Sequence, residues 1–330
     1  MVTGVDAYKT RRKYIPNIAN FKFKPKEYWN LAEARARYEN SFDPSIKMDQ
    51  IFFEDCKSGM TKMTEESVDL VIADPPFGID FSGKEHSYNR KQDLVVDFYQ
   101  EINSDYGQFT EDWMKQIQKI MKPQATAYVF SGWNHLEDVL RAARLTGLTT
   151  INHLIWKYQF GVFTKNKYVT SHYHILLLAK NKNNYYFNKM EHYPLDILDF
   201  KRKYKKGEAK NATTLPVELI QHCIEFSSKP GDLVFDPFMG MATTAVAAKS
   251  LWRHYCGFEA NQKMESLINK RLESTVAGQD YISKEEKLSQ IYNTAKEKYP
   301  SAYKLFLKEC TEGAHDKSQR RGRINHKCTV

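Results

Sequence analysis

One tetrapeptide, Asp74-Pro75-Pro76-Phe77, combines residue types that could activate an aromatic amine. The lone pair of such an amine is delocalised into the ring, so its nitrogen is a poor nucleophile. The carboxylate of Asp74 and the carbonyl oxygen of Pro75, which lies on a stiff backbone, could accept hydrogen bonds from the two N–H groups of the amine and so free its lone pair. The ring of Phe77 offers a flat surface on which an extruded base can stack. The same residues would also serve as a turn that only ends a strand.

A second segment, Asp236-Pro237-Phe238-Met239-Gly240-Met241-Ala242-Thr243-Thr244, lies between a predicted strand and a predicted helix. A turn of small residues at this place lets a cofactor approach the backbone and the helix N-terminus. About twenty residues later, Glu259 ends the next predicted strand, where a carboxylate can hold ribose hydroxyls. The segment therefore indicates a nucleotide-type cofactor, and a purely structural glycine turn is the alternative.

Apolar periodicity predicts that each segment follows a strand, residues 67–73 for the first and 231–236 for the second. Strands that alternate with helices in this way are typical of a parallel α/β sheet. Because ligands bind at the carboxyl edge of such a sheet, we expect Asp74 to lie beside the turn at Gly240. The further predicted strands are 50–53, 125–130, 151–156, 174–178 and 255–259, and the predicted helices are 109–121, 134–146, 216–226, 242–251 and 261–272.

Composition shifts divide the chain into three parts. Residues 1–48 form a basic, aromatic N-terminal extension, residues 49–275 a catalytic domain with a short basic insert at 181–210, and residues 276–330 a helical, basic tail. The last dozen residues are predicted to be disordered because they are charged and almost free of apolar side chains.

The formal net charge of +9 favours a polyanionic partner, because each Lys or Arg at a phosphate releases condensed counterions. The five scattered cysteines form no CxxC pair and no even-numbered framework, which indicates reduced thiols in the cytoplasm, and no metal is expected. The first residues lack the apolar core of a signal peptide, and no apolar run reaches the length of a membrane span. We expect a protein that works in the cytoplasm or on the chromosome.

Together the two segments resemble the family of S-adenosylmethionine-dependent amino-methyltransferases that make N6-methyladenine or N4-methylcytosine in DNA. Asp55 in FFEDC resembles the acidic residue one strand before the catalytic loop of that family. MKPQATAYVFSG and NATTLPVELIQHCIEFSSKPGDLVFDPFMG resemble further stretches, and the similarity runs from about residue 50 to 273. The resemblance implies a Rossmann-like doubly wound α/β fold, S-adenosylmethionine as cofactor, and direct methyl transfer without a covalent intermediate.

The order of the motifs, with Asp74 upstream of Gly240, resembles the beta group of that family, and Asp rather than Ser at position 74 favours adenine over cytosine. The residues that the resemblance implies for catalysis are Asp74, Pro75, Pro76 and Phe77. Those that it implies for cofactor binding are Asp55, Thr213, Asp236, Pro237, Phe238, Gly240, Thr243, Thr244 and Glu259.

Three departures from the family pattern bear on function. Ala242 stands where the family usually has a second glycine, which is tolerable if its φ is negative, and Leu215 replaces the usual Lys. The segment before Thr213 is short where many DNA enzymes of this order place a target-recognition domain. Recognition then falls to the N-terminal extension, to the C-terminal helices, or to the structure of an RNA substrate.

Nucleic-acid contacts are expected from two loops. Arg90, in Tyr88-Asn89-Arg90, could clamp the flipped base or its phosphate. A basic run could form a phosphate-contacting arm, with a solvated loop as the alternative. Its residues are Lys201, Arg202, Lys203, Lys205 and Lys206.

His172 and His174 share one face of a strand, and a structural hydrogen bond is favoured there over metal binding.

The preferred function is methylation of adenine N6 in DNA. Methylation of cytidine N4 in ribosomal or other structured RNA is the runner-up, supported by the short recognition segment and the basic extensions. A binding protein that no longer catalyses is a third hypothesis, to which Ala242 points, and a small-molecule methyltransferase is a fourth. Monomer and homodimer both stay open.

Overall fold

The computed structural model describes residues 25, 27–76, 105–158, 165–191, 194–201, 214–298, 300–301 and 303–308. Seven predicted site residues lie outside this part of the chain, namely Phe77, Arg90, Arg202, Lys203, Lys205, Lys206 and Thr213. The chain forms two compact units. One contains residues 32–188 and 195–281, and the other contains α9 (Lys284–Lys298). The division into extension, catalytic domain and tail stays a prediction.

An eight-stranded sheet organises the first unit, in the order β1-β8-β7-β2-β3-β5-β4-β6. Every adjacent pair is parallel except the two pairs that β5 makes with β3 and β4. The strands are β1 (Gln50–Phe52), β2 (Val68–Ala73), β3 (Met121–Ser131), β4 (Thr149–Lys157), β5 (His172–Ala179), β6 (Ile197–Asp199), β7 (Leu233–Asp236) and β8 (His254–Phe258).

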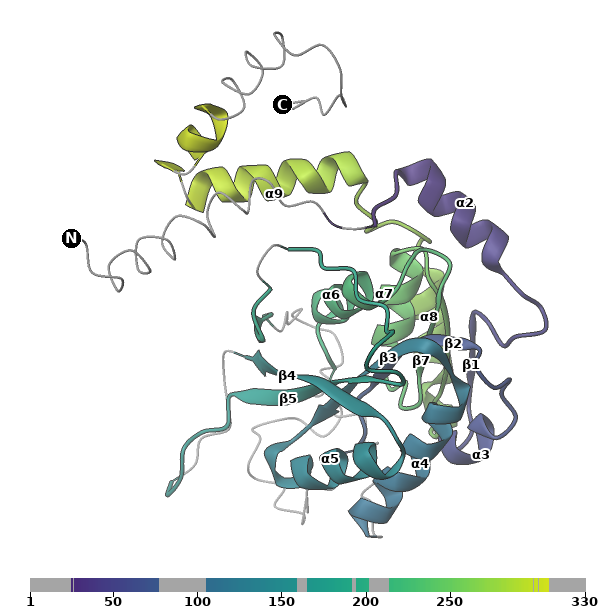
Figure 1. Cartoon of the computed structure of the whole chain (residues 1–330). Helices are drawn as coiled ribbons and strands as arrows, with labels where there is room; N and C mark the ends of the chain where they lie inside the picture. Colours follow the sequence, from purple (N-terminus) through teal and green to yellow (C-terminus); the bar gives the residue numbers. More distant parts are fainter. Residues whose placement is uncertain are drawn as a thin grey trace. The chain divides into compact units, whose positions relative to one another are not determined.

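Helices cover both faces of this sheet, as Figure 1 shows. Alternate residues of β2 point to opposite faces. Val71 packs into the core on the side of α3 (Cys56–Met60), α4 (Tyr106–Ile120) and α5 (Leu136–Leu145). Leu70 packs into the core on the side of α6 (Val217–Ser227), α7 (Thr243–Ser250) and α8 (Glu265–Glu273). The predicted doubly wound α/β architecture is confirmed.

The predicted parallel sheet has one departure at β5, which runs antiparallel to both neighbours. Its apolar run, Ile175 to Leu178, is buried on both faces of the sheet. A continuous apolar run of this kind does not indicate whether the strand is parallel or antiparallel to its neighbours. Three elements were not predicted, one of them the five-residue helix α3. Helix α2 (Leu31–Ser41) buries only Ala34 and so shows no apolar periodicity, and β6 has three residues inside a polar segment.

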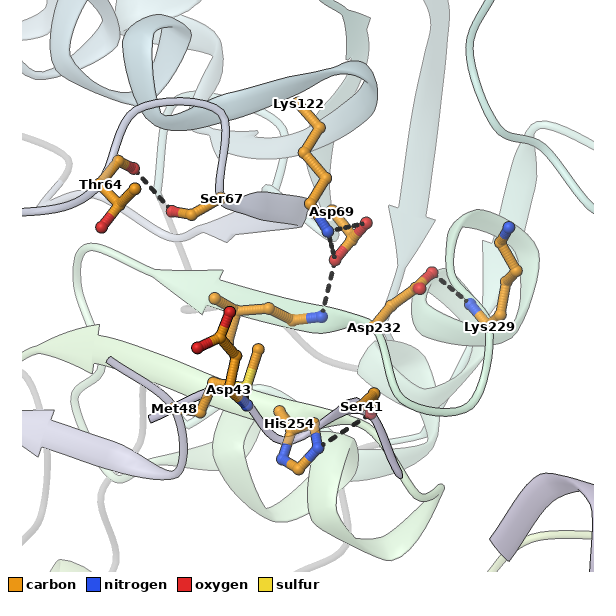
Figure 2. Close-up of polar contacts among 11 residues, drawn as sticks. Ser41, Asp43, Met48, Thr64, Ser67, Asp69, Lys122, Lys229, Asp232 and His254 are labelled. Atoms are coloured by element: carbon orange, nitrogen blue, oxygen red, sulfur yellow. Dashed lines mark hydrogen bonds and ion pairs between the residues drawn. The ribbon is translucent and has the colours of Figure 1, made fainter. Parts of the chain in front are cut away.

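Polar side chains fasten the amino edge of the sheet (Figure 2). Lys122 Nζ of β3 lies 2.7 Å from Asp69 Oδ2 of β2, and the same oxygen accepts the Leu233 N–H of β7 at 3.0 Å. In β8, His254 Nδ1 lies 2.8 Å from Asp49 Oδ2, and His254 Nε2 lies 3.2 Å from Ser41 Oγ at the end of α2. These contacts join three neighbouring strands and anchor α2 to the sheet.

Candidate active site

The two chemical segments leave the same edge of the sheet. Strands β2 and β7 are parallel neighbours, with Leu70 opposite Val234 and Val71 opposite Phe235. Their carboxyl ends therefore lie side by side, one continuing into Asp74-Pro75-Pro76 and the other into the glycine turn. Asp74 is half-buried and Pro75 is buried. The expected juxtaposition of the two loops is confirmed by this register.

Asp236 organises the start of the glycine turn. Its side chain is 4% exposed, and Oδ1 accepts the Phe238 N–H at 2.8 Å while Oδ2 accepts the Thr244 hydroxyl at 2.5 Å. Burial raises the pKa of Asp236 to about 7, with Glu259 raising it further and the two hydrogen bonds opposing the shift. The carboxyl group thus fixes the turn to the first residues of α7.

Glu259 joins the turn to the end of β8. Its Oε2 accepts the Gly240 N–H at 2.8 Å, and its Oε1 accepts the Asn261 N–H at 2.8 Å. Burial raises the pKa of Glu259, and the two backbone hydrogen bonds act in the opposite direction. A carboxylate has about four lone-pair sites, so Glu259 keeps acceptor capacity for the hydroxyls of a ligand.

The glycine turn has a left-handed backbone at two residues. Gly240 has φ +51° and Ala242 has φ +58°, so the condition of a negative φ, under which an alanine is tolerable at this position, is not met. The left-handed region costs an alanine about 1–2 kcal/mol. Arg271 of α8 offsets this strain, because its Nη1 donates to the Met241 carbonyl at 2.6 Å and to Thr243 Oγ1 at 3.1 Å.

Two residues that position the site were not found from the sequence. One is Arg271, which no local pattern connects to the turn. The other is Gly257 of β8, where a Cβ atom would lie 2.2 Å from Met239 Cε and 2.3 Å from the Asp236 carbonyl oxygen. Only glycine lets the turn pack this closely against β8. A glycine inside a predicted strand is the signal that could have revealed it.

Aromatic rings and a second acid lie next to the turn. The ring of Phe238 meets the buried indole of Trp113 edge-on, with centroids 5.3 Å apart. Pro237 and Thr243 are buried. Asp55 is exposed beyond the end of β1 and caps α3 by accepting the Ser58 N–H at 3.0 Å. Because β1 is the parallel neighbour of β8, Asp55 lies at the same edge as Glu259.

The other predicted contacts lie farther along the sheet. Lys201 is exposed just after β6, and it is the one residue of its basic run that the structure describes. His174 Nδ1 lies 2.8 Å from His153 Nε2, which confirms the structural hydrogen bond favoured for this strand. Among the described residues, no group of three or more His, Cys, Asp or Glu side chains could hold a metal ion.

A sequence model of the N6/N4 DNA methylase family matches residues 68–270, from the start of β2 into α8. The chain belongs to this family. The methylase is 29% identical over 247 residues to the Type II methyltransferase M.HinfI of Haemophilus influenzae. The matched residues make up 66% of this chain and 66% of that relative, so the chain spans just under two thirds of the relative's length. It is 27% identical over 234 residues to M2.DpnII of Streptococcus pneumoniae, covering 65% of this chain and 86% of that relative.

Solved structures share the fold of this methylase. The M1.HpyAVI–S-adenosylmethionine complex matches with a TM-score of 0.54 and 21% identity, over 68% of this chain and 98% of that one. The cytosine-N4-specific PvuII DNA methyltransferase matches with a TM-score of 0.57 and 17% identity, over 76% and 93%. The predictions of the family and of the Rossmann-like doubly wound fold are confirmed.

Proposed function

We propose that this methylase transfers the methyl group of S-adenosylmethionine to the exocyclic N6 of adenine in DNA. The observation that carries the proposal is the β2–β7 register, which places Asp74-Pro75-Pro76 and the glycine turn at one edge of the sheet. A nucleophile activated at the first loop then faces a methyl donor held at the second. Alignment of the two supplies much of the rate enhancement that a direct displacement needs.

Cofactor binding rests on the turn and on the acids beside it. The donor set fits the cofactor, because Glu259 has acceptor sites left for ribose hydroxyls and Gly257 allows the turn to pack tightly. We assign the same ligand to the exposed Asp55 and to the N-terminal end of α7. The remaining proposed contacts are Thr213, Asp236, Pro237, Phe238, Gly240, Thr243 and Thr244.

Catalysis rests on Asp74 and the two prolines after it. A carboxylate that accepts one N–H of the amino group, and the Pro75 carbonyl that accepts the other, draw the nitrogen lone pair out of the ring. Bound S-adenosylmethionine supplies the electrophilic methyl group. Phe77 completes the site as the surface on which the flipped base stacks. Fixed acceptors of this kind act where positive charge develops on the nitrogen.

The choice of adenine rests on the acid at position 74. A cytosine amino group needs the same two acceptors, and the PvuII enzyme shares the fold and is cytosine-N4-specific. The aspartate that opens the motif here favours adenine.

The proposal extends to the setting of the reaction. Arg90 and the basic run from Lys201 to Lys206 contact DNA phosphates, residues 49–275 form the catalytic domain, and the enzyme acts in the cytoplasm on chromosomal DNA, as a monomer or a homodimer. Within the described part of the chain, no helix has both the length and the apolar composition needed to cross a bilayer.

The test is incubation with methyl-labelled S-adenosylmethionine and either unmodified genomic DNA or total RNA, followed by digestion to nucleosides. We expect label in N6-methyldeoxyadenosine. Label in N4-methyldeoxycytidine would replace adenine by cytosine as the target. Label in the RNA digest alone would overturn DNA as the substrate, and no label in either would leave a protein that binds without catalysis.

A further inference from the structure

Basic charge is concentrated in one segment of the chain. Residues 139–190 contain eight Lys and Arg residues and no Asp or Glu. Removing these eight from the total of 49 basic residues leaves 41 against 40 acidic ones, so this segment accounts for nearly all of the net charge of +9. The segment spans β4 and β5, which run side by side in the sheet (Figure 1).

The two strands present one basic face. Lys157 lies opposite His172 in the ladder, and His153 and His174 are two or four positions away on the same strands. Side chains two positions apart share a face, so these four point to the same side of the sheet. Lys157 and His153 are exposed, and the rings of His172 and His174 lie 5.1 Å apart.

This face adjoins the catalytic edge. Because β5 is antiparallel to β3, its first residues lie beside the last residues of β3, with His174 opposite Ser131. The carboxyl end of β3 neighbours that of β2, which continues into Asp74. The opposite end of β5 leads to Lys180 and Lys182 at the amino edge, where Lys180 pairs with Glu66 at 3.1 Å.

Three lysines lie near the catalytic edge, and one of them is Lys157 at the end of β4. Lys165 and Lys167 lie in the connection from β4 to β5, both exposed, and beside them Tyr168 is 99% exposed. Among the described residues, no ion pair involves Lys157 or Lys165. Burial, and then His153 and His172, lower the pKa of His174, so Lys157 and Lys165 rather than His174 supply positive charge at this face.

We propose that this face of β4 and β5, together with Lys165 and Lys167 in the connection between the two strands, binds the phosphates of duplex DNA beside the flipped base. The inference rests on the proposed function and names where its substrate docks. Duplex DNA carries about one negative charge per 1.7 Å of helix axis, so a row of ammonium groups next to the catalytic edge matches it. Such contacts fix the register of the duplex and read no sequence.

The test uses the full chain with the double substitution Lys157→Gln and Lys165→Gln. The control is Lys119→Gln with Lys182→Gln, which removes the same charge from exposed lysines near the amino edge. The affinity for duplexes with and without a methylatable site is measured by fluorescence anisotropy over a range of salt concentrations. Thermal melting and calorimetric titration with S-adenosylmethionine show that both variants fold and bind cofactor as the unsubstituted chain does.

We expect the slope of log affinity against log salt to become shallower by about 0.9 for each phosphate that the variant no longer neutralises. The decrease in affinity should be equal for both duplexes, and the control should keep the original slope. An unchanged slope in the Lys157/Lys165 variant, while the unsubstituted chain binds and methylates DNA, overturns this surface and leaves the proposed function standing. A slope that falls with structured RNA but not with duplex DNA also overturns it. Failure of the unsubstituted chain to methylate DNA is instead a failure of the proposed function.

Discussion

Buried acidic side chains lie at both edges of the sheet, but the groups that they contact differ between the amino edge and the carboxyl edge. At the amino edge, burial and the neighbouring charge of Asp69 raise the pKa of Asp232, and Lys122 pairs with Asp69 (Figure 2). At the carboxyl edge, burial raises the pKa values of Asp236 and Glu259. Those two side chains accept hydrogen bonds from the backbone and from one hydroxyl, and among the described residues neither has an ion pair with Lys or Arg.

A raised pKa therefore does not by itself locate a functional site in this protein. What separates the edges is the structure to which each acid is bonded. Asp69 bonds to β3 and β7 within the sheet, whereas Glu259 bonds to a left-handed turn that precedes a helix. The contacts at the amino edge join strands of the sheet, whereas those at the carboxyl edge hold the left-handed turn at which we propose that the cofactor binds. Five predictions, some with a matched control variant, test this division.

The largest effect is expected for Asp74→Ala. Turnover should fall by at least about 10³-fold, because the amino group loses the acceptor that frees its lone pair. Calorimetry should show unchanged affinity for S-adenosylmethionine. At the other edge, Asp69→Ala should keep the turnover number of the folded enzyme. Retained activity in Asp74→Ala would remove this residue from the mechanism.

The next largest effect is expected for Glu259→Gln, in which an amide nitrogen replaces one of the oxygens that accept the Gly240 and Asn261 N–H groups. The dissociation constant for S-adenosylmethionine should rise by about 10–100-fold, as expected for loss of a charged hydrogen-bond acceptor. The matched control at the amino edge is Asp232→Asn. Equal cofactor affinities in the two variants would contradict the division between the edges.

Asp69→Ala should lower the free energy of unfolding by about 1–3 kcal/mol, because the Leu233 N–H and the Lys122 ammonium both lose their acceptor. Urea denaturation measures this change. Lys122→Met should have a smaller effect, since its ammonium is partly exposed. A change in cofactor affinity in either variant would show that contacts at the amino edge affect cofactor binding at the carboxyl edge.

Asp236→Asn should change how stability depends on pH. The folded pKa of Asp236, about 7, lies above that of the unfolded chain, so the folded state binds the extra proton between about pH 4 and pH 7. The contribution of this group to stability is thus full below pH 4 and is lost as pH rises towards 7, by up to about 1.4 kcal/mol per pH unit. The variant should gain stability relative to the unsubstituted chain over that window, as measured by urea unfolding at pH 5 and pH 8. A pH-independent difference would contradict it.

The smallest effect is expected for Ala242→Gly. Relief of the left-handed strain and the greater unfolded-state entropy of glycine oppose each other, so the unfolding free energy should rise by no more than about 1 kcal/mol. Cofactor affinity should not change, because Arg271 still holds the Met241 carbonyl. A marked gain in cofactor affinity would show that the alanine weakens the site.

Much of the site was predictable because its motifs are local. The strands that end before Asp74 and Pro237 show continuous apolar runs, and the resemblance to the methylase family rests on the short segments that follow them. The helices α4, α5 and α6 were equally predictable from the sequence, since each has apolar residues along one face.

The sequence by itself determined the strand–loop pairs and the family, and it led to the proposed role of Asp74, because each depends on neighbouring residues. Only the tertiary structure decided the direction of β5, the left-handed backbone of Ala242 and its support by Arg271. These features depend on side chains and strands that are distant in the chain and meet only when the sheet forms. Periodicity and local motifs carry no record of such partners, which is why the basic face of β4 and β5 became visible only in the fold.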